Sequence, residues 1–309
     1  MRSAAVSNIV ERLPVLRSTL HTAPKYHVGS PIENRLGLQV FRVLSKKVTR
    51  SLRQRDVSAE AEPHVRALEK DGFLVLPNFL EPELFKAITN EFDAASVAAP
   101  LKPYQGVDNA KLHRRQVLVA DTPELFPVIK ATFQRNAMLD QIVSAIIRRP
   151  VTSAPNILLD TYQCVKGSGE DNDIENILHA DLHVPTIKMF FYLSRTDESN
   201  GAFVYARRSH RLTVARLLHE YEMSVRQAKL NRGIAIDPEL LERRSKLVRN
   251  IIRPEHRRRM KIEETQLCVD ANTLVIVNNM GFHRRGEFSP DRTRKAVLIN
   301  YRNAEPAIG

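Results

Sequence analysis

The chain has 309 residues, of which 43% are hydrophobic and 27% are charged, and its formal net charge is +12. This composition excludes a chain that is disordered over most of its length, and it predicts a globular protein with one core and several elaborations. No apolar stretch approaches the roughly 20 residues that a membrane span requires, so an integral membrane protein is not expected.

The cysteines and the first residues bear on the cellular compartment. Cys164 and Cys268 both lie in apolar runs typical of strands, which predicts two buried, reduced thiols and no disulfide. Glu11, Arg12 and Arg17 interrupt the opening segment, and this disfavours a secretion signal while leaving an organellar transit peptide open. We therefore expect a cytoplasmic protein, with membrane association as an open alternative.

The positive charge is concentrated in two segments. Residues 1–56 hold 11 Lys and Arg against 3 Asp and Glu, and residues 212–260 hold 12 against 6, whereas the remainder is slightly acidic. An anionic substrate, an anionic membrane surface or a nucleic acid could each explain this pattern. The chain has no Trp and no recognised nucleic-acid motif, so a nucleic-acid partner is not expected.

Residues 1–56 are predicted to form a basic helical extension in two amphipathic pieces. In the second piece the apolar positions share one face and the basic positions share the opposite face: Leu36, Val40, Phe41, Val43, Leu44 and Val48 against Arg35, Arg42, Lys46, Lys47, Arg50 and Arg53. We favour a helix that caps the core and leaves its basic face in water. Peripheral contact with a membrane through this basic helix is the alternative.

Residues 57–309 are expected to form one domain that begins with helices and continues with short strands. After a polar linker at 56–63, the patterns predict a helix at 64–70 that stops at Asp71-Gly72, a strand at 73–76, and helices at 81–95 and 124–147. From residue 156 short apolar runs are separated by turn residues, at 157–165, 186–193, 202–206, 273–278 and 296–301. Such strands indicate a sandwich or barrel, with a charged, helical insertion at about 212–260.

The chemistry centres on His179-Ala180-Asp181. Such a triplet arises by chance in roughly half of chains with this composition, so it gains weight only from the downstream residues. His283 comes just after the strand at 273–278, and Arg294 lies on the next strand. Two His and one carboxylate can hold iron(II) on one face of an octahedron, and the positions left open accept an oxo acid and oxygen. His179 and Asp181 point the same way on an extended chain.

A buried guanidinium would hold the distal carboxylate of the oxo acid, because its planar fork can bond both oxygens. Arg294 is better placed for this than Arg292. Three further residues are candidate contacts of the co-substrate. They are Lys188 and Tyr192, which share one strand face, and Gln163, with Tyr162 as a less secure neighbour, on the strand before the triplet. His183 is expected to be a neighbour of the metal site and not a ligand, and His210 a structural residue.

Three blocks, in order, resemble the phytanoyl-CoA dioxygenase family of 2-oxoglutarate oxygenases. They are HVRALEKDGFLVLPNFLEPELFKAI, HADLHVPTIKMFFYLSRTDESNGAFVYARRSHRLT and NTLVIVNNMGFHRRGEFSPDRTRKAVLINYR, and they cover most of residues 64–303. The resemblance implies a double-stranded β-helix (jelly-roll, cupin-like) core with flanking N-terminal helices. It also implies iron(II) ligation by His179, Asp181 and His283, and 2-oxoglutarate binding by Arg294. One departure is Arg207-Arg208-Ser209-His210, where many members have Pro-Gly-Ser-His; it predicts two charges beside the pocket mouth.

The expected activity is hydroxylation of an aliphatic carbon of an anionic molecule, such as a glycan or glycolipid sugar or an acyl-type compound. Because Asp181 is present, no ligand position is vacated for chloride, and a halogenase is disfavoured. The alternative is a catalytically silent protein of the same fold that acts as a membrane- or nucleic-acid-associated binding module. Fold-level analogy alone would not decide between them.

Overall fold

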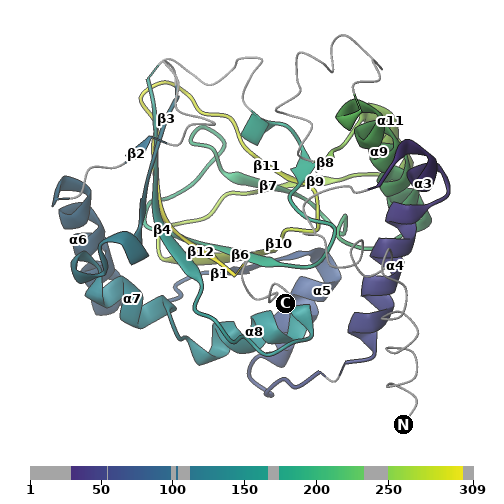
Figure 1. Cartoon of the computed structure of the whole chain (residues 1–309). Helices are drawn as coiled ribbons and strands as arrows, with labels where there is room; N and C mark the ends of the chain where they lie inside the picture. Colours follow the sequence, from purple (N-terminus) through teal and green to yellow (C-terminus); the bar gives the residue numbers. More distant parts are fainter. Residues whose placement is uncertain are drawn as a thin grey trace.

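The computed structural model describes residues 29–53, 55–98, 102–103, 112–165, 174–232 and 250–301. Within these ranges two antiparallel sheets face each other, and helices cover the outer face of the larger sheet and one end of the smaller one (Figure 1). None of the helices in these ranges is long and apolar enough to cross a membrane. The first amphipathic piece predicted within residues 1–28 lies outside the described residues.

The larger sheet has seven strands in the order β1-β10-β6-β12-β4-β3-β2. Their bounds are β1 Phe73–Leu76, β2 Lys102–Pro103, β3 Leu112–Leu118, β4 Asn156–Cys164, β6 Ile187–Tyr192, β10 Thr273–Asn278 and β12 Thr293–Asn300. The central strands are buried on both faces, which explains their nearly continuous apolar sequences. One set of alternating side chains, such as Met189 and Phe191, packs against the helices. The other set, such as Phe190 and Tyr192, faces the second sheet.

The smaller sheet has five strands in the order β8-β5-β11-β7-β9. Their bounds are β5 His179–Ala180, β7 Phe203–Ala206, β8 Asn250–Ile251, β9 Glu264–Leu267 and β11 His283–Arg285. If the two-residue β8 is left out, the strands from β4 to β12 alternate between the two sheets, except that β7 and β9 both lie in the smaller one. Eight strands connected in this way, four in each sheet, form a double-stranded β-helix, as predicted from the sequence.

Four helices cover the outer face of the larger sheet (Figure 1). They are α5 Glu62–Asp71, α6 Pro82–Ala98, α7 Pro127–Phe133 and α8 Ala137–Ile147. Helix α5 ends at Gly72, whose φ of 89° is a left-handed conformation suited to glycine. The single helix predicted over 124–147 is two helices, because Asn136 caps a new start at α8 through its side chain.

The remaining helices gather at the other end of the molecule (Figure 1). Helices α3 (Pro31–Arg35) and α4 (Leu38–Ser51) pack against α9 (Val214–Asn231), with α11 (Pro254–Arg259) beside them. Helices α9 and α11 lie within the expected insertion at about 212–260, while residues 233–249 lie outside the described part of the chain. Tyr221 of α9 donates a hydrogen bond to the carbonyl of Arg35, so the N-terminal segment and the insertion pack directly together.

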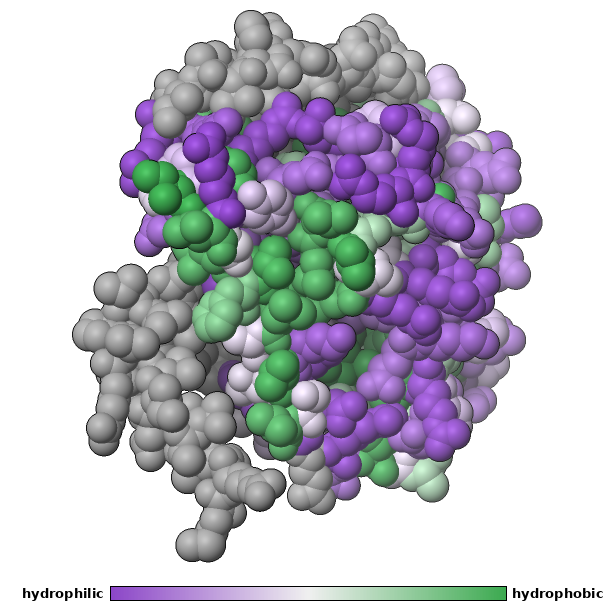
Figure 2. All heavy atoms as spheres, turned by 90° about the vertical axis from the view of Figure 1, so that its right-hand side faces the viewer, coloured by the Kyte–Doolittle hydropathy of each residue, from purple (hydrophilic) through white to green (hydrophobic). Residues whose placement is uncertain are grey.

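The predicted orientation of the second N-terminal helix is wrong. Helix α4 buries Gln39 and Arg42 together with Val43, whereas Phe41, Leu44 and Val48 are exposed. Figure 2 shows apolar side chains gathered on this side of the molecule. The sequence did not predict this division, because Arg42 of its basic face and Val43 of its apolar face are buried on the same side. It did not reveal that the neighbouring surface is polar, built around Glu220 of α9, which accepts a hydrogen bond from Gln39 over 3.3 Å.

Candidate metal centre

Two strands of the smaller sheet bring the histidines of the predicted ligand set together. His179 of β5 and His283 of β11 are direct cross-strand partners, and their ring centroids lie 4.8 Å apart. Asp181 follows β5, and the side chain of Ala180 between the two ligands packs on the opposite side with Phe282. Both ligands of the triplet therefore point into the space between the sheets, as the alternation of an extended chain requires.

The imidazoles present the correct nitrogens to a metal. Nδ1 of His179 lies 2.6 Å from the carbonyl oxygen of Ile177, and Nδ1 of His283 lies 3.0 Å from that of Gly281. Because a carbonyl only accepts, Nδ1 carries the proton in each ring and Nε2 keeps its lone pair for a metal. Burial, with the neighbouring His179, lowers the pKa of His283 to about 3, so His283 stays neutral at physiological pH, as a metal ligand must.

The three donor groups fit one metal ion. Nε2 of His179 lies 3.6 Å from Oδ1 of Asp181, and Nε2 of His283 lies 4.0 Å from Oδ2. All three ligand atoms lie within 4.8 Å of one another. Metal–ligand bonds of about 2 Å at right angles separate neighbouring donors by roughly 3 Å, so a small contraction would seat the ion. Among the described residues, this is the one group of three or more His, Cys, Asp or Glu residues arranged to hold a metal.

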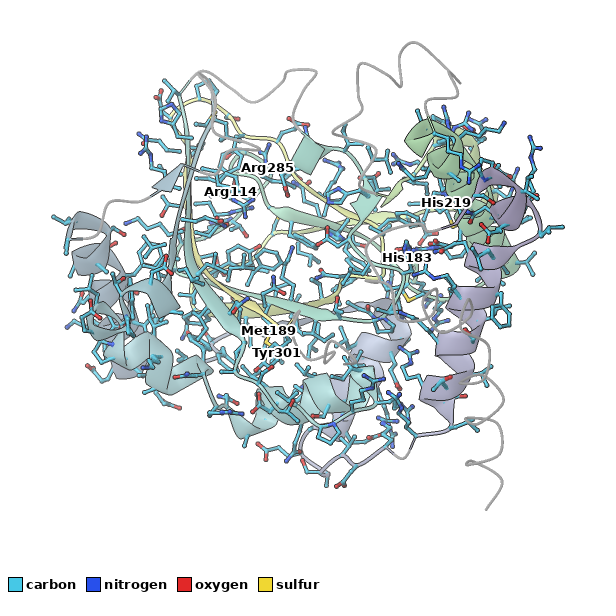
Figure 3. The ribbon with its side chains drawn as sticks, viewed as in Figure 1. Arg114, His183, Met189, His219, Arg285 and Tyr301 are labelled. Carbon is cyan, nitrogen blue, oxygen red and sulfur yellow. The ribbon has the colours of Figure 1, made fainter. Side chains whose placement is uncertain are left out.

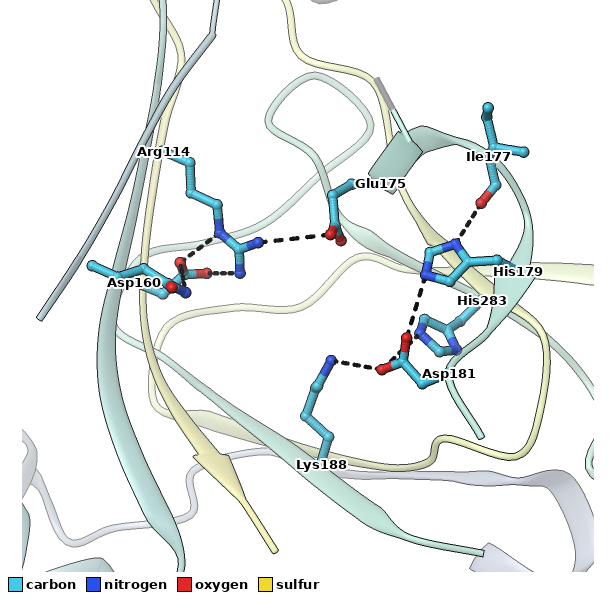
Figure 4. A network of polar contacts seen from close by, with 9 residues as sticks. Arg114, Asp160, Glu175, Ile177, His179, Asp181, Lys188 and His283 are labelled. Carbon is cyan, nitrogen blue, oxygen red and sulfur yellow. Dashed lines mark hydrogen bonds and ion pairs between the residues drawn. The ribbon is translucent and has the colours of Figure 1, made fainter. Parts of the chain in front are cut away.

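Lys188 contacts the metal-ligand carboxylate (Figure 4). It lies on the inward face of β6, as its shared strand face with Tyr192 suggested, and its Nζ is 3.3 Å from Oδ2 of Asp181. This amine can fix the orientation of the Asp181 carboxylate and balance its charge. The structure thus places Lys188 beside the metal position, whereas the sequence pattern predicted a co-substrate contact.

Arg294 occupies the interior of the barrel at some distance along the sheet from the triad. It lies opposite Tyr162 in the pairing of β12 with β4, and its guanidinium carbon is 4.4 Å from the centroid of the Tyr162 ring. Nη1 donates to the carbonyl of Gly201, whereas Nε is buried and has no hydrogen-bond partner among the described residues. The rival candidate Arg292 is exposed. Of the two, only Arg294 could therefore clamp a ligand inside the barrel.

Tyr192 lies near Arg294 on the same inner surface. It is fully buried on β6, and its hydroxyl likewise has no hydrogen-bond partner within the described part of the chain. Burial raises the pKa of Tyr192 to about 12, although the nearby Arg294 acts in the opposite direction. A buried, neutral hydroxyl donor beside a guanidinium is suited to a carboxylate ligand.

The structure does not bring Gln163 to the site. Gln163 is exposed, because side chains on β4 alternate and its neighbours Tyr162 and Cys164 take the inward positions. Tyr162, the less secure of the two sequence candidates on this strand, is the residue that contacts Arg294.

Two interior arginines were missed by sequence reasoning. Arg114 of β3 donates to both oxygens of Asp160, at 2.8 and 3.3 Å, and Arg285 lies over the ring of Phe288 at 5.1 Å. Both are buried, and Figure 3 shows them between the two sheets. Arg285 lies two residues after His283 on a strand, which is a spacing that could have revealed its inward direction. For Arg114 no signal was available, because its strand was not predicted.

The remaining candidates have structural contacts. His183 is buried and is not part of the ligand set, and its Nδ1 lies 3.4 Å from Oε2 of Glu220. His210 lies 3.0 Å from the carbonyl of Glu69. Arg207 and Arg208, expected beside a pocket mouth, both contact Asp71 at the end of α5, and Arg207 does so through two hydrogen bonds of 2.8 and 2.9 Å.

The comparisons with known proteins identify no family. No family model and no curated protein matches the chain, so the resemblance to the phytanoyl-CoA dioxygenase family stays a prediction.

Several solved structures are similar in shape. The 2-oxoglutarate-dependent epimerase SnoN from nogalamycin biosynthesis aligns with a TM-score of 0.49 and 10% identity, over 78% of this chain and 82% of that one. HygX from Streptomyces hygroscopicus, with nickel and 2-oxoglutarate bound, aligns with a TM-score of 0.43 and 16% identity, over 79% of this chain and 87% of that one. EctD from S. alaskensis, with bound Fe, aligns with a TM-score of 0.45 and 12% identity, over 80% of this chain and 78% of that one. Because these TM-scores are below 0.5, the site is assigned from its own geometry.

Proposed function

We propose that the chain is an iron(II)- and 2-oxoglutarate-dependent oxygenase that hydroxylates an aliphatic carbon of an anionic substrate. The observation that carries the proposal is the placement of His179, Asp181 and His283 inside the same barrel as Arg294. Two imidazoles and one carboxylate favour iron(II) with open positions over a closed structural zinc site. A catalytically silent relative would be expected to lack a ligand or the arginine, and this chain has all four.

Each residue has a definite task in this proposal. The carbonyls of Ile177 and Gly281 hold the two imidazoles with Nε2 toward the metal position, and Lys188 holds Asp181. Arg294 and Tyr192 would receive the distal carboxylate of 2-oxoglutarate, which satisfies two buried donors that otherwise lack hydrogen bonds among the described residues. When bound, iron(II) and 2-oxoglutarate supply oxygen activation coupled to oxidative decarboxylation of the oxo acid.

The balance of charge supports an anionic substrate. Among the described residues, the inner surface of the barrel carries four cationic side chains, on Arg114, Lys188, Arg285 and Arg294. It carries three carboxylates, on Asp160, Glu175 and Asp181. A divalent metal adds positive charge that the dianionic 2-oxoglutarate offsets. The remaining excess, together with the basic segments 1–56 and 212–260, favours a phosphorylated or carboxylated sugar, a glycolipid head group or an acyl-type compound.

An anaerobic titration tests the proposal. Iron(II) added to the protein with 2-oxoglutarate should produce a weak visible charge-transfer band, and Asp181→Ala should abolish it while the far-ultraviolet circular dichroism stays unchanged. A screen of anionic sugars and acyl compounds for oxygen-dependent succinate release would then identify the substrate class. Well-folded protein that shows no band, or Asp181→Ala protein that releases succinate at the full rate, would refute the assignment.

A further inference from the structure

Helix α4 buries polar side chains and exposes several large apolar ones, unlike an ordinary surface helix. Its inner side carries the polar residues Gln39 and Arg42, which are 1% and 2% exposed, together with Val43, which is 3% exposed, and Arg42 donates a 2.9 Å hydrogen bond to Gln39. Its outer side carries Phe41, Leu44 and Val48, and together with Leu52 just after the helix they recur at helical spacing and form one stripe. Val48 is 56% exposed and Leu52 is 72% exposed. A surface helix usually places such an apolar stripe against the core.

The stripe continues onto the neighbouring helices. Ile32 of α3, Leu36 at its end, and Val214 and Leu218 at the start of α9 are exposed as well. Figure 2 shows apolar side chains gathered on this side of the molecule, with hydrophilic side chains around them. We call these eight residues, Ile32, Leu36, Phe41, Leu44, Val48, Leu52, Val214 and Leu218, the docking face. An exposed apolar patch of this kind marks an interaction site more often than it marks chance.

The surrounding charge indicates which partner fits. Exposed basic residues accompany the stripe, with Arg35 on α3 and Lys47 beside Val48 on α4. Apart from the buried Arg42, residues 29–53 hold five Lys and Arg that are at least partly exposed, and a single acid, Glu33. A second copy docking through the same face would oppose two basic surfaces. The chain's own residues 1–28 would do the same, because they hold four Lys and Arg and one acid. An anionic lipid surface is attracted by all of these charges.

We propose that the docking face binds an anionic lipid surface, with the apolar stripe entering the interface between headgroups and acyl chains and the basic residues contacting the headgroups. This inference is independent of the proposed enzymatic function. It also differs from the membrane contact expected from the sequence, because the contact is made by the apolar side of α4 while Arg42 stays buried within the protein. The inner side of α4 faces His183 and Val184, which follow the metal ligand Asp181 by two and three residues. Lipid docking would therefore bring the membrane close to the metal segment.

The absence of tryptophan from the chain allows a direct test of insertion. Phe41→Trp introduces a single tryptophan, which can be excited selectively, into the stripe of the full-length protein. Mixed phosphatidylcholine and phosphatidylglycerol vesicles should shift its emission to the blue, and pure phosphatidylcholine vesicles should not. Val97→Trp on α6 is the matched control, since Val97 is 89% exposed on another helix, and its emission should not respond. Emission of Phe41→Trp that is already blue without vesicles and unchanged by them would mean that protein covers the stripe, and would overturn the proposal.

Partitioning supplies the second test. The wild-type protein should sediment with anionic vesicles at low salt and be released as salt rises. Leu44→Ser combined with Val48→Ser should weaken partitioning by about tenfold or more, because two apolar side chains no longer leave water. Leu84→Ser combined with Val97→Ser on α6 should leave partitioning unchanged, and circular dichroism should confirm that both pairs fold. Equal loss in both pairs, no sedimentation with any vesicle, or a dimer that dissociates in the Leu44→Ser/Val48→Ser variant would each refute lipid docking.

Discussion

The guanidinium of Arg294 lies over the ring of its cross-strand partner Tyr162, 4.4 Å from the ring centroid, while its Nε remains buried without a hydrogen bond among the described residues. The ring of Tyr162 and the carbonyl of Gly201 fix the orientation of the Arg294 guanidinium, and its remaining N–H groups can donate to a ligand. Removal of this cation should therefore weaken binding of the co-substrate more than binding of the metal.

Arg294→Gln should raise the KM for 2-oxoglutarate by about 10- to 100-fold, because a charge-assisted bond to a buried carboxylate contributes on the order of 1.5–3 kcal/mol. Iron(II) affinity should change little, since Arg294 is not one of the three metal ligands. The measurement is succinate release against 2-oxoglutarate concentration. Arg292→Gln, an exposed change two residues away, is the control and should leave KM as it is; equal effects of both changes would contradict the assignment.

Arg114→Met should lower the free energy of unfolding by about 3–5 kcal/mol, because it leaves the carboxylate of Asp160 buried without its cationic partner. Urea unfolding followed by circular dichroism measures the change. Arg115→Met, on the other face of the same strand, should alter stability by less than about 0.5 kcal/mol. Adding Asp160→Leu to Arg114→Met should recover much of the loss, and an unaltered loss in the double variant would show that the ion pair is not the cause.

The acid dependence of stability should include a measurable part from His210. Burial lowers its pKa to about 4, from an ordinary value of 6.5. The unfolded chain therefore binds a proton that the folded protein does not as the pH falls from 6.5 to 4, and the unfolding free energy decreases over that window. One proton corresponds to at most about 1.4 kcal/mol per pH unit. His210→Gln should reduce the slope by up to this amount between pH 4.5 and 6.5, and parallel slopes would disprove the contribution.

Cys268 should be the thiol that reacts in the native protein. Two buried cysteines were predicted from the sequence, but only Cys164 is buried, and Cys268 is exposed one residue after β9. The folded protein should consume one equivalent of a chromogenic disulfide reagent, and the denatured protein should consume two. Cys268→Ser should remove the native reaction; a native equivalent that persists in this variant would place the reactive thiol at Cys164.

The central strands of the larger sheet and the first two ligands could be predicted because their signals are local. The runs at β6 and β10 are mostly apolar, and His179 and Asp181 are separated by one residue on an extended chain. Strands such as β3 and β11 could not be predicted, because Arg114, His283 and Arg285 make them look hydrophilic. Their polar side chains are buried against partners that come from distant strands. The buried side of α4 was predicted wrongly for a related reason, since the periodicity of a helix does not show which of its sides packs against the rest of the protein.

Helix α4 also bears on how the protein should be handled. Residues 1–56 resemble a dispensable basic tail in sequence, and a shortened protein beginning at residue 57 is an obvious choice for expression. Such a protein would lose Gln39, which donates to Glu220, and would uncover the surface of α9 and His183 beneath α4. Glu220 would keep its ion pair with Arg216, at 3.0 Å, but water would reach the Glu220 carboxylate more easily. Glu220 also contacts His183, which lies two residues after the metal ligand Asp181. Weak activity of a protein shortened in this way would therefore indicate that the segment carrying Asp181 and His183 has lost its packing against α4, and not that the wrong substrate was tested.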